Sequence, residues 1–190
     1  MQLSLQNILP LYFDKNGRDS EIWQTELLIK EGDYVKIVAP SGSGKTSLIH
    51  FLYGMRNEYS GNILYDKKNI RSFGAEEFAS LRKNEVSIVF QDLRLFPEQT
   101  VFQNLEIKRQ LNPFHRPEKI QEMADRLGIA NKLSSHARIC SYGEQQRIAI
   151  IRALLQPFSI LLLDEPFSHL DNRNSELAME LMLEESKIRT

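Results

Sequence analysis

The sequence lacks three features, and each absence excludes a class of protein. A single cysteine, Cys140, leaves no partner for a disulfide within the chain, which fits a reducing compartment. No apolar run reaches the ~20 residues that cross a bilayer, since the nearest candidate, residues 148–163, is interrupted by Arg152 and Pro157. The 24 basic residues nearly balance the 25 acidic ones, so a net charge of −1 gives no overall attraction to nucleic acid.

The N-terminal stretch also lacks the features of a targeting segment. MQLSLQNILPLYFDKNG has neither a basic start nor a long apolar run, so we do not expect a signal peptide. We therefore expect any work at a membrane to depend on a partner protein. The 190 residues, 42% of them hydrophobic, are enough for one domain or for one domain with an attached lobe.

The central motif of the sequence is VAPSGSGKTSLI, residues 38–49, and the other motifs are interpreted around it. An apolar run rich in β-branched residues predicts a strand at 34–39, and the apolar spacing after the loop predicts a helix at 46–53 that ends at Gly54. Strand, glycine-rich loop and helix in this order are the context of a phosphate-binding loop. The alternative is a Gly/Ser-rich turn between a strand and a helix.

The residue types inside this loop fit a phosphate. Gly42 and Gly44 let backbone N–H groups turn inward, and the positive end of the helix that starts near Lys45 adds to the attraction. Lys45 brings a charge to the β- and γ-phosphates, and the Thr46 hydroxyl is placed for Mg²⁺. The usual pattern GxxxxGK(S/T) begins with glycine, whereas this chain has Ala39, which resists backbone shapes that are open to glycine.

A second stretch, SILLLDEP at 159–166, places two carboxylates at the end of an apolar strand. Neighbouring residues of a strand point to opposite sides, so Asp164 can face a Mg²⁺ ion while Glu165 faces a water aimed at the γ-phosphate. A carboxylate in that position can orient or deprotonate the attacking water. The alternative is an acidic turn after a strand.

A third stretch, CSYGEQQRIAIIRAL from Cys140, opens an apolar helix. Ser141 and, three residues on, Glu144 form a capping box, and this structural interpretation is one alternative. In the other, the Ser141 hydroxyl, the Gly143 N–H and the start of the helix bind an anion. One chain would then carry two phosphate-binding helix starts, which need not serve the same nucleotide in the same chain.

Hydrophobic periodicity predicts the remaining elements. Prolines punctuate residues 92–139, which we expect to be an all-helical insertion. The expected strands are 3–9, 22–29, 61–65, 86–90 and 160–163, and the expected helices are 75–82, 101–111, 118–127, 144–155 and 174–187. A polar turn is expected at 14–20.

With these motifs in series, the sequence resembles the ATPase subunit of an ATP-binding cassette (ABC) transporter. APSGSGKT resembles Walker A, ILLLDE resembles Walker B with the catalytic glutamate, and CSYGEQQR resembles the LSGGQ signature, with Tyr142 in place of its first glycine. VFQD resembles the Q-loop around Gln91, and SHLD resembles the D-loop that crosses the dimer. The stretch from Lys83 looks similar to the ATPases of lipoprotein-releasing and macrolide-export systems.

The resemblance implies an α/β fold: a P-loop NTPase (RecA-like) core with an antiparallel β subdomain and an α-helical subdomain. Residues 1–190 would form a single nucleotide-binding domain, with 1–91 and 140–190 as catalytic core and β subdomain and 92–139 as helical subdomain. The family ends its core with a further strand and a switch histidine, and this chain stops at Thr190 before them. We therefore expect the chain to be truncated and to lack its C-terminal strands, which leaves open whether this form hydrolyses ATP.

The resemblance also implies ATP and Mg²⁺ as cofactors. It implies catalysis by Glu165, Gln91 and Lys45, and metal binding by Thr46, Gln91 and Asp164. The residues that it implies in nucleotide binding are Tyr12, Ala39, Pro40, Ser41, Gly42, Ser43, Gly44, Lys45, Thr46, Ser47, Ser141, Gly143, Glu144 and Asp171. Tyr12 would stack on adenine, or is simply a packed aromatic. Asp171 is also expected to cap the last helix.

As partners the resemblance implies a second nucleotide-binding subunit, forming a homodimer, and transmembrane permease subunits, with no nucleic acid. ATP would lie between the P-loop of one subunit and the signature of the other, on the cytoplasmic side of the inner (plasma) membrane. Leu95, Phe96 and Phe102 are candidates for the permease contact, or else they form the core of the helical lobe. The alternative function is a regulatory subunit that binds nucleotide with little hydrolysis, because Ala39 and Tyr142 depart from the family pattern.

Overall fold

The computed structural model describes residues 1–13 and 20–187, and the turn expected at 14–20 falls largely outside them. The chain divides into two compact units, Met1–Leu81 and Arg82–Thr190, which are described separately below. Within the described residues no helix is long and apolar enough to cross a membrane. The division into 1–91 with 140–190 and 92–139 stays a prediction.

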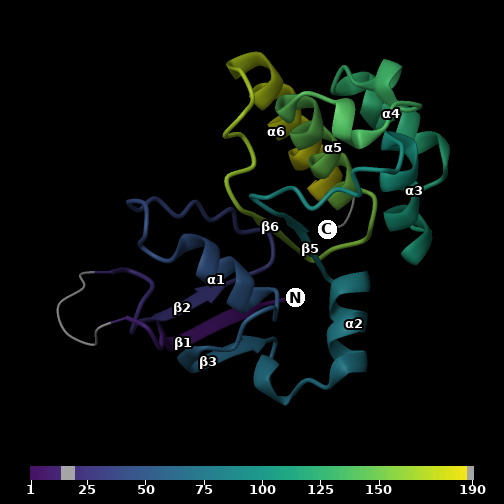
Figure 1. Cartoon of the computed structure of the whole chain (residues 1–190). Helices are drawn as coiled ribbons and strands as arrows, with labels where there is room; N and C mark the ends of the chain where they lie inside the picture. The colour runs from purple at the N-terminus through teal and green to yellow at the C-terminus, as the bar shows by residue number, and fades with distance from the viewer. Residues whose placement is uncertain (14–19, 188–190) are drawn as a thin grey trace. The chain divides into compact units, whose positions relative to one another are not determined.

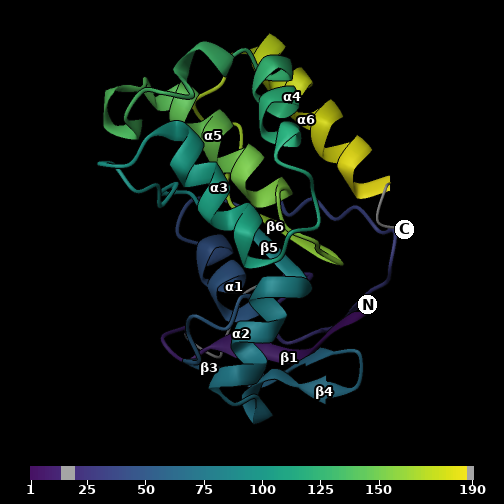
Figure 2. The same cartoon turned by 90° about the vertical axis from the view of Figure 1, so that its right-hand side faces the viewer.

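The first unit is built on a four-stranded antiparallel sheet in the order β2-β1-β3-β4, of which Figure 1 labels β1, β2 and β3 and Figure 2 labels β4. Its strands are β1 (Leu3–Pro10), β2 (Glu26–Ile29), β3 (Tyr59–Tyr65) and β4 (Lys68–Asn69). Leu3 pairs with Ile29 on one side and Tyr65 on the other. Leu3 and Leu5 are buried and Ser4 between them is not, as the period of two of a strand requires. The expected strand at 3–9 is confirmed.

A bulge interrupts the pairing of β1 with β3, and a glycine accommodates it. The register shifts between Gln6 and Leu9, and Asn7 takes a left-handed φ of 52°. Opposite the bulge, Gly61 has φ 81°, and a Cβ there would lie 2.4 Å from the carbonyl oxygens of Gln6 and Asn7. No other residue fits at position 61 without displacing the backbone of β1.

The helices of the first unit are α1 (Lys45–Leu52), the 3₁₀ turn η1 (Ile70–Ser72) and α2 (Ala75–Asn84), which runs past the end of the unit. Leu48, Phe51 and Leu52 of α1 are buried. The Tyr65 hydroxyl donates a hydrogen bond to the Leu52 carbonyl over 2.7 Å, and burial raises the pKa of Tyr65. This bond ties the end of α1 to the last residue of β3.

The strand expected at 34–39 is wrong. The segment has no regular secondary structure, and Tyr34 and Val38 are 69% and 81% exposed. No described strand pairs with it. A β-branched run is stable as a strand only when it packs and pairs, and its composition alone does not supply a neighbour.

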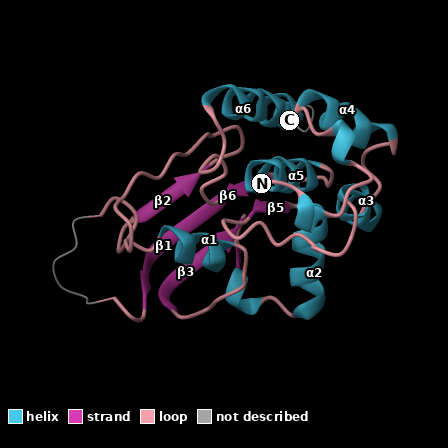
Figure 3. Cartoon of the chain, turned by 45° about the horizontal axis from the view of Figure 1, so that its top comes forward, coloured by secondary structure: helices cyan, strands magenta, loops and turns pink. Residues whose placement is uncertain are grey.

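The second unit contains a parallel pair of strands, β5 (Val86–Val89) and β6 (Ile160–Leu163) (Figure 3). Val86 pairs with Ile160 at the start of the two strands. Its helices are α3 (Val101–Leu111), α4 (Glu118–Arg126), α5 (Tyr142–Leu154) and α6 (Asn172–Lys187), with 3₁₀ turns η2 (Ala130–Lys132) and η3 (Ala137–Ile139). Helix α5 contacts α3, α4 and α6 (Figure 2). Its residues 148–151 are all buried, so α5 is the centre of this unit's core.

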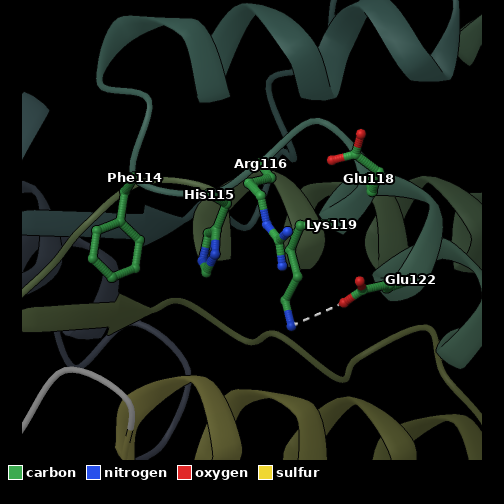
Figure 4. Close-up of a pocket in the computed structure, with 6 residues that line it drawn as sticks. All are labelled: Phe114, His115, Arg116, Glu118, Lys119 and Glu122. Carbon is green, nitrogen blue, oxygen red and sulfur yellow. Dashed lines mark ion pairs between the residues drawn. The ribbon is translucent and has the colours of Figure 1, made fainter.

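A buried ion cluster joins α6 to the start of α4. Glu185 is 1% exposed, and its carboxylate lies 3.3 Å from His115 Nε2 and 3.1 Å from Lys119 Nζ. Lys119 also pairs with Glu122 at the edge of a pocket that Phe114 and His115 help to line (Figure 4). Burial raises the pKa of Glu185, but His115 and Lys119 outweigh it, so the pKa is lowered and the carboxylate stays charged.

Candidate nucleotide-binding and hydrolysis site

Two glycines shape the loop of the first unit that is predicted to bind phosphate. Gly42 and Gly44 have φ values of 77° and 94°, in the left-handed region that side chains disfavour. Gly44 caps α1 with no side-chain hydrogen bond, so the first N–H groups of the helix are not taken by a capping side chain. A Cβ on Gly44 would also lie 2.9 Å from Trp23 and 3.1 Å from Phe13. The loop therefore has the shape and the donors that an anion requires.

Ala39 replaces the first glycine of the pattern without backbone strain. Its φ is not positive, so the loop does not use the conformation that only glycine adopts freely. What the loop uses at this position is a carbonyl: Lys45 Nζ donates to the Ala39 oxygen over 2.7 Å and to the Pro40 oxygen over 3.1 Å. Any residue could supply these two acceptors.

A buried hydroxyl supports the interpretation of the loop as a ligand site. Ser43 Oγ is buried, and no described residue forms a hydrogen bond with it. Trp23 Nε1 donates to the Ser43 carbonyl over 3.1 Å and holds this part of the loop in place. The two glycines, the uncapped helix start and this hydroxyl fit the phosphates of a nucleotide. Sequence reasoning missed Trp23, whose only signal is that it is the single tryptophan.

Tyr12 lies beside α1. Its hydroxyl donates to Ser47 Oγ, and the residue is 52% exposed. Phe13 packs edge-on against the ring with centroids 5.0 Å apart, and the Arg56 guanidinium lies 5.6 Å from its centroid. The ring is thus held beside α1 with part of the residue open to solvent, and stacking on a base stays a prediction.

In the second unit, β5 and β6 position the two carboxylates. The Asp164 N–H extends the ladder by donating to the Val89 carbonyl over 3.0 Å. Asp164 is 4% exposed, whereas Glu165 is exposed and takes a left-handed φ of 49°. Gln91 Nε2, just past β5, lies 3.3 Å from Glu165 Oε2. The structure thus brings Gln91 and Glu165 together, as the paired carboxyl ends of parallel strands allow.

The residues predicted to bind Mg²⁺ would supply only part of its ligands. No group of three His, Cys, Asp or Glu residues that could hold a metal occurs in residues 1–13 and 20–187. Mg²⁺ is commonly held by one or two carboxylates with phosphate oxygens and water rather than by an all-protein cage. Thr46 in the first unit, and Gln91 and Asp164 in the second, each carry an oxygen that suits such an ion, and their binding of one Mg²⁺ stays a prediction.

The capping box expected at the start of α5 is confirmed. Ser141 Oγ accepts from the Glu144 N–H over 3.3 Å, and Glu144 Oε2 accepts from the Ser141 N–H over 2.7 Å. Lys132 Nζ lies 3.3 Å from the same carboxylate. Burial raises the pKa of Glu144, but the Ser141 N–H and Lys132 outweigh it and the pKa is lowered. Anion binding by Ser141 and Gly143 stays a prediction.

Asp171 caps the last helix, as expected. Its Oδ1 accepts from the Asn174 N–H over 2.8 Å, and this bond lowers the pKa of Asp171. The capping role is compatible with the predicted role in nucleotide binding, which stays untested.

Arg152 supports the segment that follows Gln91, and sequence reasoning missed it. Its guanidinium donates to the carbonyl oxygens of Leu93 and Arg94, each over 2.6 Å. These two residues have left-handed φ values of 59° and 48°. The one available signal was a cation in the apolar helix α5, which by itself only argues against a membrane span.

Of the three candidates for the permease contact, two are open to solvent. Phe96 and Phe102 are 52% and 43% exposed. Leu95 packs instead against the hydrophobic core of the second unit, as the alternative interpretation required.

The mixed α/β fold and the phosphate-binding loop define the class first: a P-loop nucleotide-binding protein. The chain belongs to the ABC transporter family, whose sequence pattern matches residues 23–168. It is 32% identical over 181 residues to the lipoprotein-releasing system ATP-binding protein LolD of Buchnera aphidicola, covering 94% of this chain and 79% of LolD. It is 36% identical over 162 residues to the macrolide export ATP-binding/permease protein MacB of Nitrosomonas europaea, covering 84% of this chain and 25% of MacB.

A solved structure gives the same result for the fold. The post-hydrolysis dimer of the ATP-binding cassette MJ0796, bound to ADP and Pi, superposes with a TM-score of 0.82 at 25% identity, covering 97% of this chain and 82% of that chain. The predicted α/β fold class and the resemblance to the lipoprotein-release and macrolide-export branch are both confirmed.

Proposed function

We propose that this chain binds ATP with Mg²⁺ and hydrolyses it to power an ABC transporter. The contact between the Gln91 amide and the exposed carboxylate of Glu165, beside the buried Asp164, carries the proposal. It places a hydrogen-bond donor and a potential base together at the end of a parallel strand pair. A base so placed can orient the attacking water.

The roles of the other residues follow from their chemistry. Lys45 would exchange its two carbonyl partners for the β- and γ-phosphates, where its charge is needed. The N–H groups of the loop and of the first turn of α1 would bind phosphate oxygens. Thr46, Asp164 and Gln91 would hold Mg²⁺, whose chemistry is to neutralise charge that develops between the β- and γ-phosphates.

The partners in this proposal are a second copy of the chain and permease subunits. The relatives named LolD and MacB are, by their names, an ATP-binding protein of a release system and an ATP-binding/permease protein, and MJ0796 is a dimer. We infer that Ser141 and Gly143 of one copy complete the nucleotide site of the other, and that exposed Phe96 and Phe102 contact the permease. The chain would then work as a peripheral subunit on the cytoplasmic face of the membrane.

A regulatory subunit that binds ATP with little hydrolysis is the second candidate. One observation favours it: Tyr142, at the position of the signature's first glycine, presents a side chain that is 47% exposed. A bulky side chain at that position could limit how closely a phosphate approaches.

The test is ATP turnover by the full-length protein with its membrane partner. We expect Glu165→Gln to lower turnover by about 10²-fold or more, on the order of what general acid–base catalysis contributes. Lys45→Ala should lower it by a similar factor, because the charge that stabilises the phosphates is lost. Glu176→Gln on α6, also exposed, is the matched control and should leave turnover unchanged. Equal turnover in Glu165→Gln and Glu176→Gln would refute hydrolysis by Glu165, and nucleotide binding without turnover in the wild type would favour the regulatory subunit.

A further inference from the structure

The first residue of α5 contacts the loop that follows Glu165. The rings of Tyr142 and His169 lie with centroids 4.2 Å apart and tilted by 53°. Both side chains belong to the second unit, and both residues are exposed overall. Aromatic pairs at this distance stabilise the arrangement of the two segments that carry them.

Backbone contacts around the rings show that the two segments touch along several residues. A Cβ on Gly143 would lie 2.9 Å from the His169 carbonyl oxygen, so only glycine fits between them. The His169 ring nitrogen Nδ1 lies 2.8 Å from Ser168 Oγ, which gives the ring a second contact. The ring contact is therefore part of a close packing of loop against helix.

One buried amide connects this packing to Glu165. Gln146, which is 2% exposed, donates from Nε2 to the Glu165 carbonyl over 3.0 Å and accepts at Oε1 from the His169 N–H over 3.0 Å. Gln146 lies one turn along α5 from Tyr142. The left-handed φ of Glu165 costs backbone energy and persists only where surrounding contacts hold it.

We propose that Tyr142 and His169 are a positioning pair, which together with Gln146 sets the orientation of Glu165 relative to the Ser141–Gly143 end of α5. The proposal rests on the proposed function, since it assigns Glu165 the role of base. It gives a purpose to the tyrosine that departs from the family's signature: the ring replaces a glycine and gains a contact within its own chain. Neither residue of the pair touches the reacting atoms.

The test compares ring-removing and ring-keeping variants in steady-state ATP hydrolysis by the full-length protein with its membrane partner. Tyr142→Ala and His169→Ala should each lower kcat about threefold to tenfold with the KM for ATP unchanged, since ring pairs of this kind contribute a matching amount. Tyr142→Phe keeps the ring and should retain the wild-type kcat. The double variant Tyr142→Ala/His169→Ala should be no slower than either single variant, because the second change removes a contact that is already lost.

Met179→Ala on α6 is the control, because Met179 is 42% exposed and Tyr142 47%. Circular dichroism measures the folded fraction of each variant. Three outcomes would each overturn the proposed positioning pair. They are a loss of kcat that only follows the folded fraction, additive losses in the double variant, and a Tyr142→Phe variant as slow as Tyr142→Ala. A wild-type protein that turns over ATP no faster than Glu165→Gln would instead overturn the proposed function, and the pair with it.

Discussion

Removing Arg152 should release the segment after Gln91, and the size of the effect can be worked out from the contacts of the guanidinium. Its two hydrogen bonds go to the carbonyls of Leu93 and Arg94, two consecutive residues in the left-handed region. Such residues cost roughly 1–2 kcal/mol each, so about 2–4 kcal/mol of strain must be offset locally. Hydrogen bonds from a charged donor contribute about 1.5–3 kcal/mol, which is enough to hold the turn.

We therefore expect Arg152→Ala to lower the free energy of unfolding by about 1.5–3 kcal/mol, the amount that hydrogen bonds from a charged donor contribute. Arg152→Lys keeps the charge but not the fork of donors and should recover only part of the loss. The assay is urea denaturation followed by circular dichroism. The dependence of the unfolding free energy on urea concentration should be the same for wild type and variants, as a single transition requires.

Arg138→Ala is the matched control. Arg138 pairs at the surface with Glu98, both side chains are more than half exposed, and its removal should change stability by less than about 0.5 kcal/mol. If Arg152→Ala and Arg138→Ala unfold at the same urea concentration, the left-handed turn does not depend on the guanidinium and the reasoning is refuted.

Three further predictions concern stability. Burial and the charge of Arg152 lower the pKa of Lys108 from 10.5 to about 8, so at neutral pH its charge opposes folding. Lys108→Met should be more stable than wild type at pH 7 in urea titrations, with an advantage that shrinks as pH rises from about 8 to 10.5; an advantage independent of pH would contradict this. The pKa of Glu185 is instead lowered by His115 and Lys119, so its contribution is present above its ordinary pKa of 4.5 and is lost as pH falls below it. Glu185→Gln should destabilise by about 3 kcal/mol at pH 7, as broken buried pairs do, and match wild type in acid; an equal deficit at both pH values would argue against the ion cluster. Gly61→Ala should lower the midpoint of thermal unfolding by forcing the bulge of β1 apart, and an unchanged midpoint would show that β1 can yield.

Local signals predicted those features whose causes are local. The alternation of Leu3 and Leu5 with polar neighbours predicted β1, and the three-residue spacing from Ser141 to Glu144 predicted the capping box. The bounds of α3 were predicted from the helical spacing of the residues at 101–111, and the structure adds a Thr100 capping box at its start. In each case the residues that determine the structure lie within one or two turns of one another.

Features that depend on distant partners were not predicted. The β-branched run at 34–39 has the composition of a strand, but a strand needs a neighbour that the run does not encode. Arg152 lies nearly sixty residues from the carbonyls that it binds, and Tyr142 contacts His169 in the loop that follows Glu165, in a different element of the chain. Family resemblance supplied the order of the motifs, and no pattern in the sequence indicated these contacts.

The capping box has a consequence for the end of α5. The Glu144 carboxylate accepts a hydrogen bond from the Ser141 N–H, close to the partial positive charge of the helix start. A phosphate arriving there would meet a resident anion and share its donors. Because the pKa of Glu144 is lowered, this competitor keeps its charge throughout the neutral range. If this helix start binds phosphate as proposed, the competing carboxylate would weaken that binding and favour the release of a product over its retention.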